Sequence, residues 1–396
     1  MQACLRADGR KGIRNLVAVA YLVECAHHVA REITLPLRDQ GVHLIGFPGC
    51  YPNAYAARIM RQLCTHPNVG AVLLVSLGCE SFDRQALAAE IRASGRPVET
   101  LVIQESGGTE STIRDGQAWV RRVLAEIQSA PRVEMRVDEL VVGTICGGSD
   151  ATSGLTANPA AGRAFDLLIE HHGIAIFEET GELIGCEQLM ARRAVTAELG
   201  REIEAAVGKA ERYYRTLGHG SFAPGNAEGG LTTIEEKSLG AYCKSGKSRI
   251  AGLIKPGDVP PHAGLYLLDV VPDGEVRFGF PNISDNAEIV ELIACGCHLI
   301  LFTTGRGSVV GSAVSPVIKI CANPHTYRKL SGDMDVDAGR ILEGRGTLDE
   351  VGREIFRRIL DVAAGQPTAS ERLRHQEFIL TYKAFEPIGP GCLPPL

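Results

Sequence analysis

The feature that most constrains the fold of this chain is an alternation, over its first half, of short β-branched runs with amphipathic stretches. Such an alternation is typical of a parallel sheet covered by helices. Strands are predicted at residues 16–23, 42–47, 71–76, 101–104, 140–145 and 174–177. Helices are predicted between these strands at residues 25–33, 54–63, 83–93, 109–127 and 158–171.

The second half of the chain resumes this pattern after a break. A long polar helix is predicted at residues 197–217, and a Gly-rich stretch follows at residues 218–230. Apolar runs return at residues 265–271, 299–303 and 317–321, and residues 348–385 have a helical period. Because 396 residues exceed what one compact core usually holds, we predict an α/β fold with two Rossmann-like parallel-sheet domains and covering helices. The predicted domains are residues 1–217 and residues 218–396.

Composition and charge exclude several classes of protein. A formal net charge of −6 argues against a nucleic-acid partner, whose binding surface normally carries a basic stripe. No apolar run reaches the ~18 residues that span a bilayer, and the N-terminus has charged residues where a signal peptide has an apolar core. We therefore expect a cytoplasmic protein with no membrane partner. Its 12 cysteines are expected to be reduced, and each is a buried hydrophobe, a metal ligand or a nucleophile.

Most predicted strands of the first half are followed directly by a thiol or polar side chain. Ligands of open parallel sheets bind outside the carboxyl ends of the strands, so we expect these side chains to meet at one edge. They are Cys25, Cys50, Cys79 with Glu80, Gln104 with Glu105, Cys146, and Glu178 with Glu179. Three of the thiols lie in Gly-rich turns, which allow a ligand to approach the backbone closely.

This edge is the predicted metal site. The candidate ligands are Cys50, Cys79, Glu80 and Cys146. A mixed thiolate and carboxylate set suits ferrous iron, whereas three thiolates from three loops suit an iron–sulfur cluster with one open iron. The prediction depends on topology, because the chain has no CxxC or HExxH spacing. The competing interpretation is that each cysteine is buried and inert.

A Gly-rich segment at residues 229–238, GGLTTIEEKS, is a candidate for binding the carboxylate of a small acid. Thr232 or Thr233 is expected to cap a helix that begins at the next residues, with a glutamate completing a capping box. The N-terminus of such a helix also attracts anions. Lys237 adds a positive charge there, and it is able to act as a base where burial lowers its pKa.

Two further groups are candidates for the same task. Residues 303–307, TTGRG, follow a predicted strand and offer hydroxyls, backbone donors and Arg306, whose guanidinium binds carboxylates bidentately. Near the N-terminus, Arg10, Arg14 and Asn15 form a polar strip that is also suited to an anion. The competing interpretation of this strip is solvated surface charge.

Several motifs together resemble the altronate/galactarate dehydratase family. They are residues 8–15 (DGRKGIRN), 78–80 (GCE), 146–150 (CGGSD), 153–159 (SGLTANP), 229–239 and 303–307. The resemblance runs from about residue 6 to about residue 340, with the motifs in the family's order. It implies a lyase that eliminates water from a sugar acid to give a 2-keto-3-deoxy acid, usually with Fe²⁺ or Mn²⁺.

Within this resemblance the site residues receive roles. We expect Ser149, Asp150 and Asn158 to contact the substrate, together with the threonines and arginines named above. The reaction needs a base with a tuned pKa to remove a weakly acidic C–H proton. Lys237 is the first candidate for this base, and Glu179 is the second.

The resemblance leaves alternatives open. A related branch of the family eliminates sulfite from sulfolactate, so the chain is alternatively the large subunit of a sulfolactate sulfo-lyase. Single-chain members for sugar acids carry a small domain ahead of the DGR motif, which we expect here to be missing or to come from a separate small subunit. An inactive relative that binds a sugar acid is a further alternative. We expect a homo-oligomer, as is frequent in families of this sort.

Overall fold

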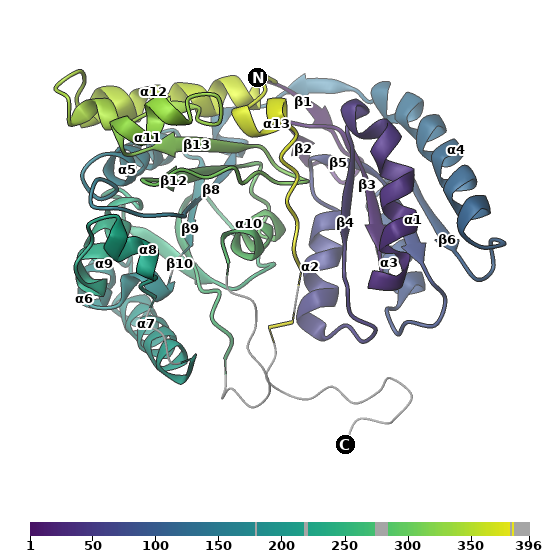
Figure 1. Cartoon of the computed structure of the whole chain (residues 1–396), viewed down its shortest axis with the longest axis horizontal. Coiled ribbons are helices and arrows are strands. Elements are labelled where there is room, and N and C mark those ends of the chain that lie inside the picture. Colours follow the sequence, from purple (N-terminus) through teal and green to yellow (C-terminus); the bar gives the residue numbers. More distant parts are fainter. Residues whose placement is uncertain (179, 218–220, 274–283, 381, 384–396) are drawn as a thin grey trace.

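The computed structural model describes residues 1–178, 180–217, 221–273, 284–380 and 382–383. These residues form two parallel sheets with covering helices and one small antiparallel sheet (Figure 1). The predicted α/β class with Rossmann-like parallel sheets is confirmed. Within the part of the chain that is described, no helix is long and apolar enough to cross a membrane.

The first parallel sheet has four strands in the order β4-β3-β5-β6. The strands are β3 (Leu16–Tyr21), β4 (Val42–Gly46), β5 (Val69–Ser76) and β6 (Val98–Val102). The helices are α1 (Glu24–Thr34), α2 (Ala54–Cys64), α3 (Arg84–Ala93) and α4 (Thr109–Gln128). Every residue of β5 is buried, as expected for a strand of a parallel sheet covered on both faces. We call these strands and helices the smaller lobe.

The second parallel sheet has seven strands in the order β10-β11-β9-β8-β12-β13-β14. The strands are β8 (Val141–Cys146), β9 (Ile174–Glu178), β10 (Ile250–Ile254), β11 (Gly264–Leu268), β12 (Leu299–Thr304), β13 (Val317–Cys321) and β14 (Val336–Asp337). The helices are α5 (Ala157–Glu170), α6 (Glu187–Ala191), α7 (Ala197–Leu217), α8 (Pro224–Glu228), α9 (Ile234–Cys243), α10 (Asp285–Ala294), α11 (Pro324–Lys329), α12 (Leu348–Ala363) and α13 (Ala369–Leu373). We call these elements the larger lobe. Short 3-10 helices lie at Leu35–Gln40, Val137–Glu139, Thr180–Leu183 and Gly339–Ile341.

A small antiparallel sheet joins the two lobes. Its strands are β1 (Gln2–Leu5), β2 (Lys11–Gly12) and β7 (Arg132–Glu134), in the order β2-β1-β7. Buried side chains continue the connection: Asn68 of the smaller lobe donates to the backbone oxygen of His298 at 3.0 Å. The ring of His298 in turn lies 2.9 Å from the backbone oxygen of Lys11.

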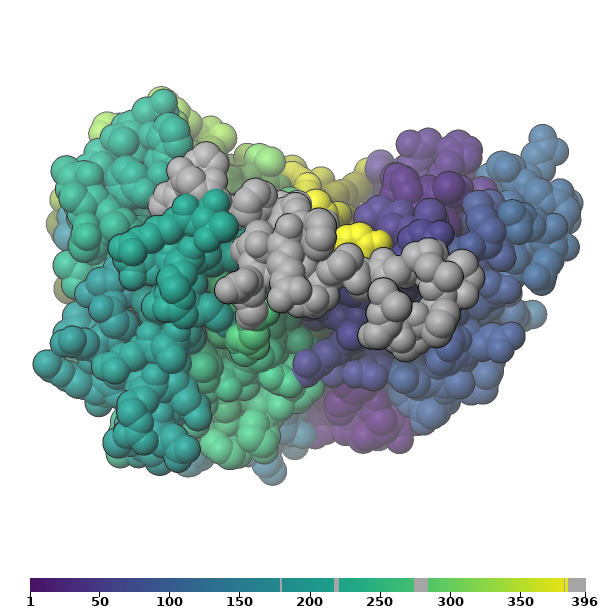
Figure 2. Space-filling model, turned by 90° about the horizontal axis from the view of Figure 1, so that it is seen from below, coloured from purple at the N-terminus to yellow at the C-terminus, as the bar shows by residue number. Residues whose placement is uncertain are grey.

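The lobes share one hydrophobic core. A single buried cluster contains Ala20 and Ile45 from the smaller sheet together with Ile145 and Ile300 from the larger sheet. Figure 2 shows the two lobes side by side from below, with the purple-to-blue residues at one end and the teal-to-green residues at the other. Two more clusters fill the outer faces, one under α1 and α4 and one under α5, α7 and α12.

The sheets divide the chain elsewhere than at the predicted boundary, residue 217. Strands β8 and β9 precede that residue, yet they pair with β12 and β11, which follow it. The division between the sheets therefore lies between α4 and β8, near residue 130. Local pattern misled the prediction here, because the polar helix α7 and the Gly-rich stretch after it interrupt the alternation inside one lobe.

The predicted helical tail at residues 348–385 is only partly helical. It contains α12 and α13 and then continues without regular secondary structure through the described residues up to 383. Gly365 has a φ of 109°, which favours glycine, and Pro367 has no N–H to donate to a helix. After α13 the chain runs down between the two lobes, as the yellow segment in Figure 1 shows. Residues 384 and 385 lie outside the described residues.

Candidate active site

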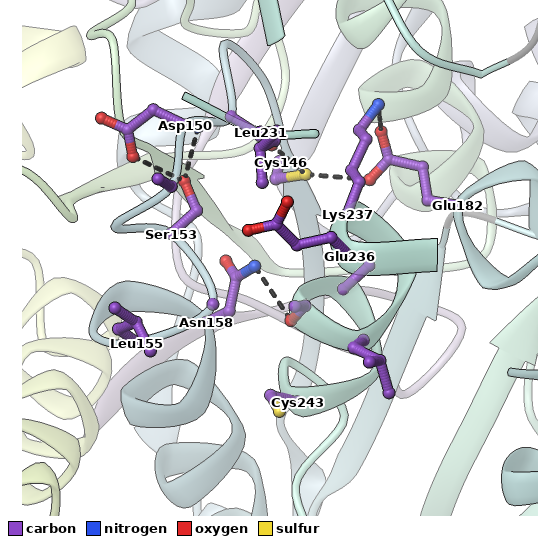
Figure 3. Close-up of a pocket in the computed structure, with 16 residues that line it drawn as sticks. Cys146, Asp150, Ser153, Leu155, Asn158, Glu182, Leu231, Glu236, Lys237 and Cys243 are labelled. Atoms are coloured by element: carbon purple, nitrogen blue, oxygen red, sulfur yellow. Dashed lines mark hydrogen bonds and ion pairs between the residues drawn. The ribbon is translucent and has the colours of Figure 1, made fainter. Parts of the chain in front are cut away.

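A cavity of about 230 Å³ lies at the carboxyl end of β8, where the strand order of the larger sheet reverses. The chain places β9, β11 and β10 on one side of β8 and then places β12, β13 and β14 on the other side. Ligands of open α/β sheets bind in the crevice at such a switch point. The polar side chains of the cavity wall include Cys146, Ser149, Asp150, Asn158, Glu182 and Lys237 (Figure 3).

The loop after β8 packs tightly against neighbouring backbone. Gly147 donates its N–H to the backbone oxygen of Thr303 at 3.1 Å, and the N–H of Arg306 donates to Gly148 at 2.8 Å. A Cβ at position 147 would lie 2.1 Å from Oδ2 of Asp285, and Gly148 has a φ of 62°. Gly147 is therefore needed because a side chain has no room there, and Gly148 is favoured because its φ is positive.

Asp150 organises this loop from within. Its Oδ1 accepts from the backbone N–H and the hydroxyl of Thr152, at 2.9 and 2.6 Å. Its Oδ2 accepts from Asn323, just beyond β13, at 3.0 Å. A Cβ at Gly305 would lie 2.1 Å from Oδ1 of Asp150, so the TTGRG loop needs its first glycine to pass this carboxylate. Asp150 lines the cavity, and its hydrogen bonds also hold the cavity wall together.

The reactive groups gather around Glu182, on the 3-10 helix that follows β9. One of its carboxylate oxygens lies 2.5 Å from Nζ of Lys237, at the start of α9. The other oxygen accepts from the Cys146 thiol at 3.1 Å and lies 4.0 Å from Nζ of Lys244. Ser149 Oγ lies 3.2 Å from the same thiol. Figure 3 shows Cys146, Glu182 and Lys237 converging from three different elements.

The environment sets the protonation states of two of these groups. Burial, reinforced by the charge of Glu182, raises the pKa of Cys146 to about 11, so the side chain is a neutral thiol at neutral pH. Burial opposes the charge of Lys237, but the neighbouring Glu182 carboxylate outweighs it and raises the pKa of the lysine. Lys237 is therefore an ammonium group at neutral pH, which opposes the base role predicted for it.

Asn158, on the first turn of α5, offers the cavity an unused hydrogen-bond acceptor. Its Nδ2 donates to the backbone oxygen of Gly240 at 3.0 Å. Its Oδ1 is buried and has no hydrogen-bond partner among the described residues. A buried acceptor without a partner is costly unless a ligand or water satisfies it. This oxygen is chemically suited to accept from a hydroxyl group, and the predicted contact of Asn158 with a substrate stays a prediction.

The two threonines of the GGLTTIEEKS segment cap α9. Thr233 is its N-cap and accepts from the backbone N–H of Glu236 at 3.3 Å. The backbone N–H and the hydroxyl of Thr232 both donate to the Glu236 carboxylate, at 2.7 and 2.6 Å. The predicted cap at Thr233 is confirmed, whereas the Glu236 carboxylate accepts from Thr232 and not from the cap residue. Both threonines are absent from the cavity wall, which Glu236 joins instead.

The N-terminal strip lies away from the cavity. Arg10 pairs with Asp8 at 2.7 Å, and Arg14 binds Glu371 with a shortest distance of 2.6 Å. Asn15 donates to the backbone oxygen of Ile127 at 2.7 Å. The structure therefore gives Arg10 a local partner and gives Arg14 and Asn15 distant ones. It does not bring these three residues to the predicted substrate site.

Another candidate, Arg306, is absent from the cavity wall. Arg306 crosses to α8, where it donates to the backbone oxygen of Gly225 and pairs with Glu228 at 3.0 Å. Glu179, the second candidate base, lies outside the described residues.

The predicted metal ligands are divided between the lobes. Cys50 and Cys79 are exposed in the smaller lobe, after β4 and β5, whereas Cys146 is buried in the larger lobe. Glu80 accepts from the Ser76 hydroxyl and from the backbone N–H of Gly78. Among the described residues, no three His, Cys, Asp or Glu side chains are grouped so that they hold a metal ion. The predicted set therefore does not fit a single ion, because its strands belong to two different sheets.

Comparison with known proteins identifies relatives along the whole chain. Residues 137–385 match the family model for the C-terminal part of D-galactarate/altronate dehydratase, and residues 4–128 match that for the second domain of D-galactarate dehydratase/altronate hydrolase. The chain is 34% identical to the (2R)-sulfolactate sulfo-lyase subunit beta of Chromohalobacter salexigens, over 95% of each protein. It is 34% identical to the galactarate dehydratase (L-threo-forming) of Escherichia coli, over 78% of this chain and 59% of the relative. It is 28% identical to the altronate dehydratase of Bacillus subtilis, over 95% of this chain and 76% of the relative.

Proposed function

Because the chain belongs to the D-galactarate/altronate dehydratase family, we propose that it is a lyase that removes water from a sugar acid at the cavity beyond β8. The observation that carries the proposal is the pairing of Glu182 with Lys237 at 2.5 Å inside this cavity. Elimination of water needs one group that accepts a proton from carbon and one that gives a proton to the leaving hydroxyl. The pair supplies both.

In the first step, Glu182 accepts the proton from C2, next to the substrate carboxylate. The electron pair of that C–H bond forms the C2=C3 double bond, and the C3–O bond breaks. The hydroxyl leaves as water with a proton from the Lys237 ammonium. This assignment gives the base role to Glu182 instead of Lys237, in keeping with the raised pKa of the lysine.

In the second step, the enol becomes the 2-keto-3-deoxy acid. The neutral amine of Lys237 accepts the proton of the enol hydroxyl, and Glu182 gives its proton to C3. Both side chains return to their starting states, so the sequence needs no further reactant. In this proposal Asn158 and Ser149 bind substrate hydroxyls, and Lys244, 4.0 Å from Glu182, adds a second positive charge for an anionic substrate.

A second candidate reaction is the release of sulfite from sulfolactate. It is supported by the relative of nearly equal length, which is named a sulfolactate sulfo-lyase subunit. That name also supports a separate small subunit as a partner. Homo-oligomer formation stays a prediction. The same base would remove the proton from carbon in either reaction, and only the leaving group would differ.

One experiment separates these candidates. Purified protein is incubated with altronate, galactarate and sulfolactate, and keto-acid formation and free sulfite are measured. We expect keto acid without sulfite from a sugar acid. Sulfite release from sulfolactate alone would assign the chain to the second reaction. Binding of the acids without turnover would instead favour the inactive, sugar-acid-binding alternative.

A requirement for Fe²⁺ or Mn²⁺ stays a prediction from the family resemblance, and no step above is assigned to an ion. It is checked by measuring metal and acid-labile sulfide in protein purified without oxygen. Roughly one iron per chain and no sulfide would support a mononuclear requirement. Several irons with matching sulfide would indicate a cluster instead, and the failure of added Fe²⁺ or Mn²⁺ to bind would contradict the requirement.

A further inference from the structure

One face of α10 carries a row of carboxyl groups that the proposed reaction does not use. Asp285, Glu288 and Glu291 follow one another at intervals of three residues, which places them on one side of the helix. From the first to the last, the row covers about 9 Å of the helix axis. Asp285, the first residue of the row, lies against Gly147, which is the residue next to Cys146. A Cβ atom added to Gly147 would lie 2.1 Å from Oδ2 of Asp285.

The far end of this row is a buried ion pair. Glu291 Oε2 lies 2.7 Å from Nζ of Lys383, and the two side chains are 0% and 2% exposed. Nζ also donates to the backbone oxygen of Val270 at 3.2 Å. The hydroxyl of Tyr55, on α2, donates to Oε1 of Glu291 at 2.5 Å. One carboxylate thus joins the smaller lobe, α10 and the segment after α13.

The surroundings of this pair are rich in carboxyl groups. Glu178, at the end of β9, is 1% exposed, and neither of its oxygens has a hydrogen-bond partner in the described part of the chain. Glu178, Glu288 and Glu291 all interact electrostatically with Lys383. Burying a charge without a partner is very costly. Removing Lys383 would therefore leave the buried carboxyl group of Glu291 without its cationic partner.

The segment that carries Lys383 is itself held in place. The hydroxyl of Tyr382 donates to the backbone oxygen of Tyr51 at 2.5 Å, and its ring packs edge-on against Phe47 at 5.3 Å between centroids. Leu380 is buried in the core shared by the two lobes. These contacts fix the position of the Lys383 ammonium group between the lobes.

We propose that Lys383 is a positioning residue for the active site: by binding Glu291 it holds α10, and through Asp285 it holds the loop that carries Cys146. This inference rests on the proposed function for its effect on turnover. A short helix moves as a unit, so displacement of its last turn changes the position of its first turn. A shift of about 1 Å in a catalytic site is enough to lower a rate about a hundredfold.

The test compares Lys383→Met with the double variant Lys383→Met, Glu291→Gln. Hydrogen exchange of residues 285–294 and 146–150 is measured together with kcat and KM for the acid that the wild type converts. In Lys383→Met we expect exchange at both segments to rise, and kcat of the folded protein to fall, by about tenfold or more. The double variant removes both charges, and it should recover most of both losses.

Two further variants keep the outcome decisive. Lys383→Arg retains the charge and should behave like the wild type, whereas Lys329→Met, which removes an exposed lysine of α11, is the control for loss of a lysine. A Lys383→Met protein with a lower melting temperature but unchanged kcat and unchanged exchange at residues 146–150 would overturn the inference, as would a double variant that recovers neither loss. If Lys383→Met does not fold, the double variant decides the test: near wild-type exchange and kcat would support the inference, and the lack of either would overturn it. If the wild type converts no acid, the proposed function fails, while the exchange data still test the inference.

Discussion

Replacing Glu182 by glutamine is expected to reduce kcat by about 10²–10⁴-fold, because the substitution removes the group proposed to accept the proton from C2. Glutamine has nearly the same shape and still accepts a hydrogen bond from Lys237, so the cavity should remain intact. KM should change much less than kcat. The rate of keto-acid formation, measured with the preferred acid at several pH values, checks this prediction.

The same loss is expected for Lys237→Met, because the leaving hydroxyl would lose its proton donor. Glu202→Gln, which changes an exposed carboxylate of α7, is the matched control and should retain wild-type turnover. A Glu182→Gln protein that keeps a tenth or more of the wild-type kcat would contradict the assignment of the base. The roles would then have to be sought among the carboxyl groups of α10 or outside the described residues.

The elements of the fold were predictable from the sequence where periodicity was strong. The helix predicted at residues 197–217 is α7, and the strand predicted at residues 317–321 is β13, with the same limits. Which strands share a sheet was not predictable, because pairing depends on how the crossover helices pack. The prediction placed Cys79 and Cys146 on one edge, yet their strands belong to different sheets.

The candidate site was predictable where residues lie in Gly-rich loops at strand ends. Cys146, Ser149 and Asp150, from the end of β8 and the loop after it, line the cavity with Asn158 of α5 and Lys237 of α9. The residues of the N-terminal strip carried the same kind of signal, but their partners are remote: Arg14 and Glu371 are 357 positions apart. No local pattern reports such a contact.

Glu182 was missed for a related reason. It is one of several glutamates at or after the end of β9, and Glu178 and Glu187 lie within five residues of it. Only the packing of the 3-10 helix against α9 selects it, by placing its carboxylate between Lys237 and Cys146. Its position four residues after a strand end was a usable signal, but the sequence offers no means of ranking it above its neighbours.

The buried carboxyl groups beside the site should make the stability of the protein depend on pH in an unusual direction. Burial raises the pKa of Glu288 from 4.5 to about 8, and burial raises that of Glu178 well above its ordinary value. Between about pH 4.5 and pH 8, Glu288 therefore keeps its proton in the folded chain but has released it in the unfolded chain. Its contribution to stability is therefore fully present below about pH 4.5 and is lost as the pH rises to about 8.

Replacing Glu288 by glutamine removes this titration. We expect the free energy of unfolding of the wild type to fall, relative to that of the variant, by up to about 1.4 kcal/mol per pH unit between pH 5 and pH 8. Denaturant titrations of both proteins at pH 5 and pH 8 measure this difference, and Glu204→Gln, an exposed change on α7, is the control. An equal change in the free energy of unfolding between pH 5 and pH 8 for the wild type and Glu288→Gln would mean that Glu288 is ionised in the folded protein at neutral pH. The electrostatic demand on Lys383 would then be larger, because its ammonium group would face the carboxylate of Glu288 in addition to that of Glu291.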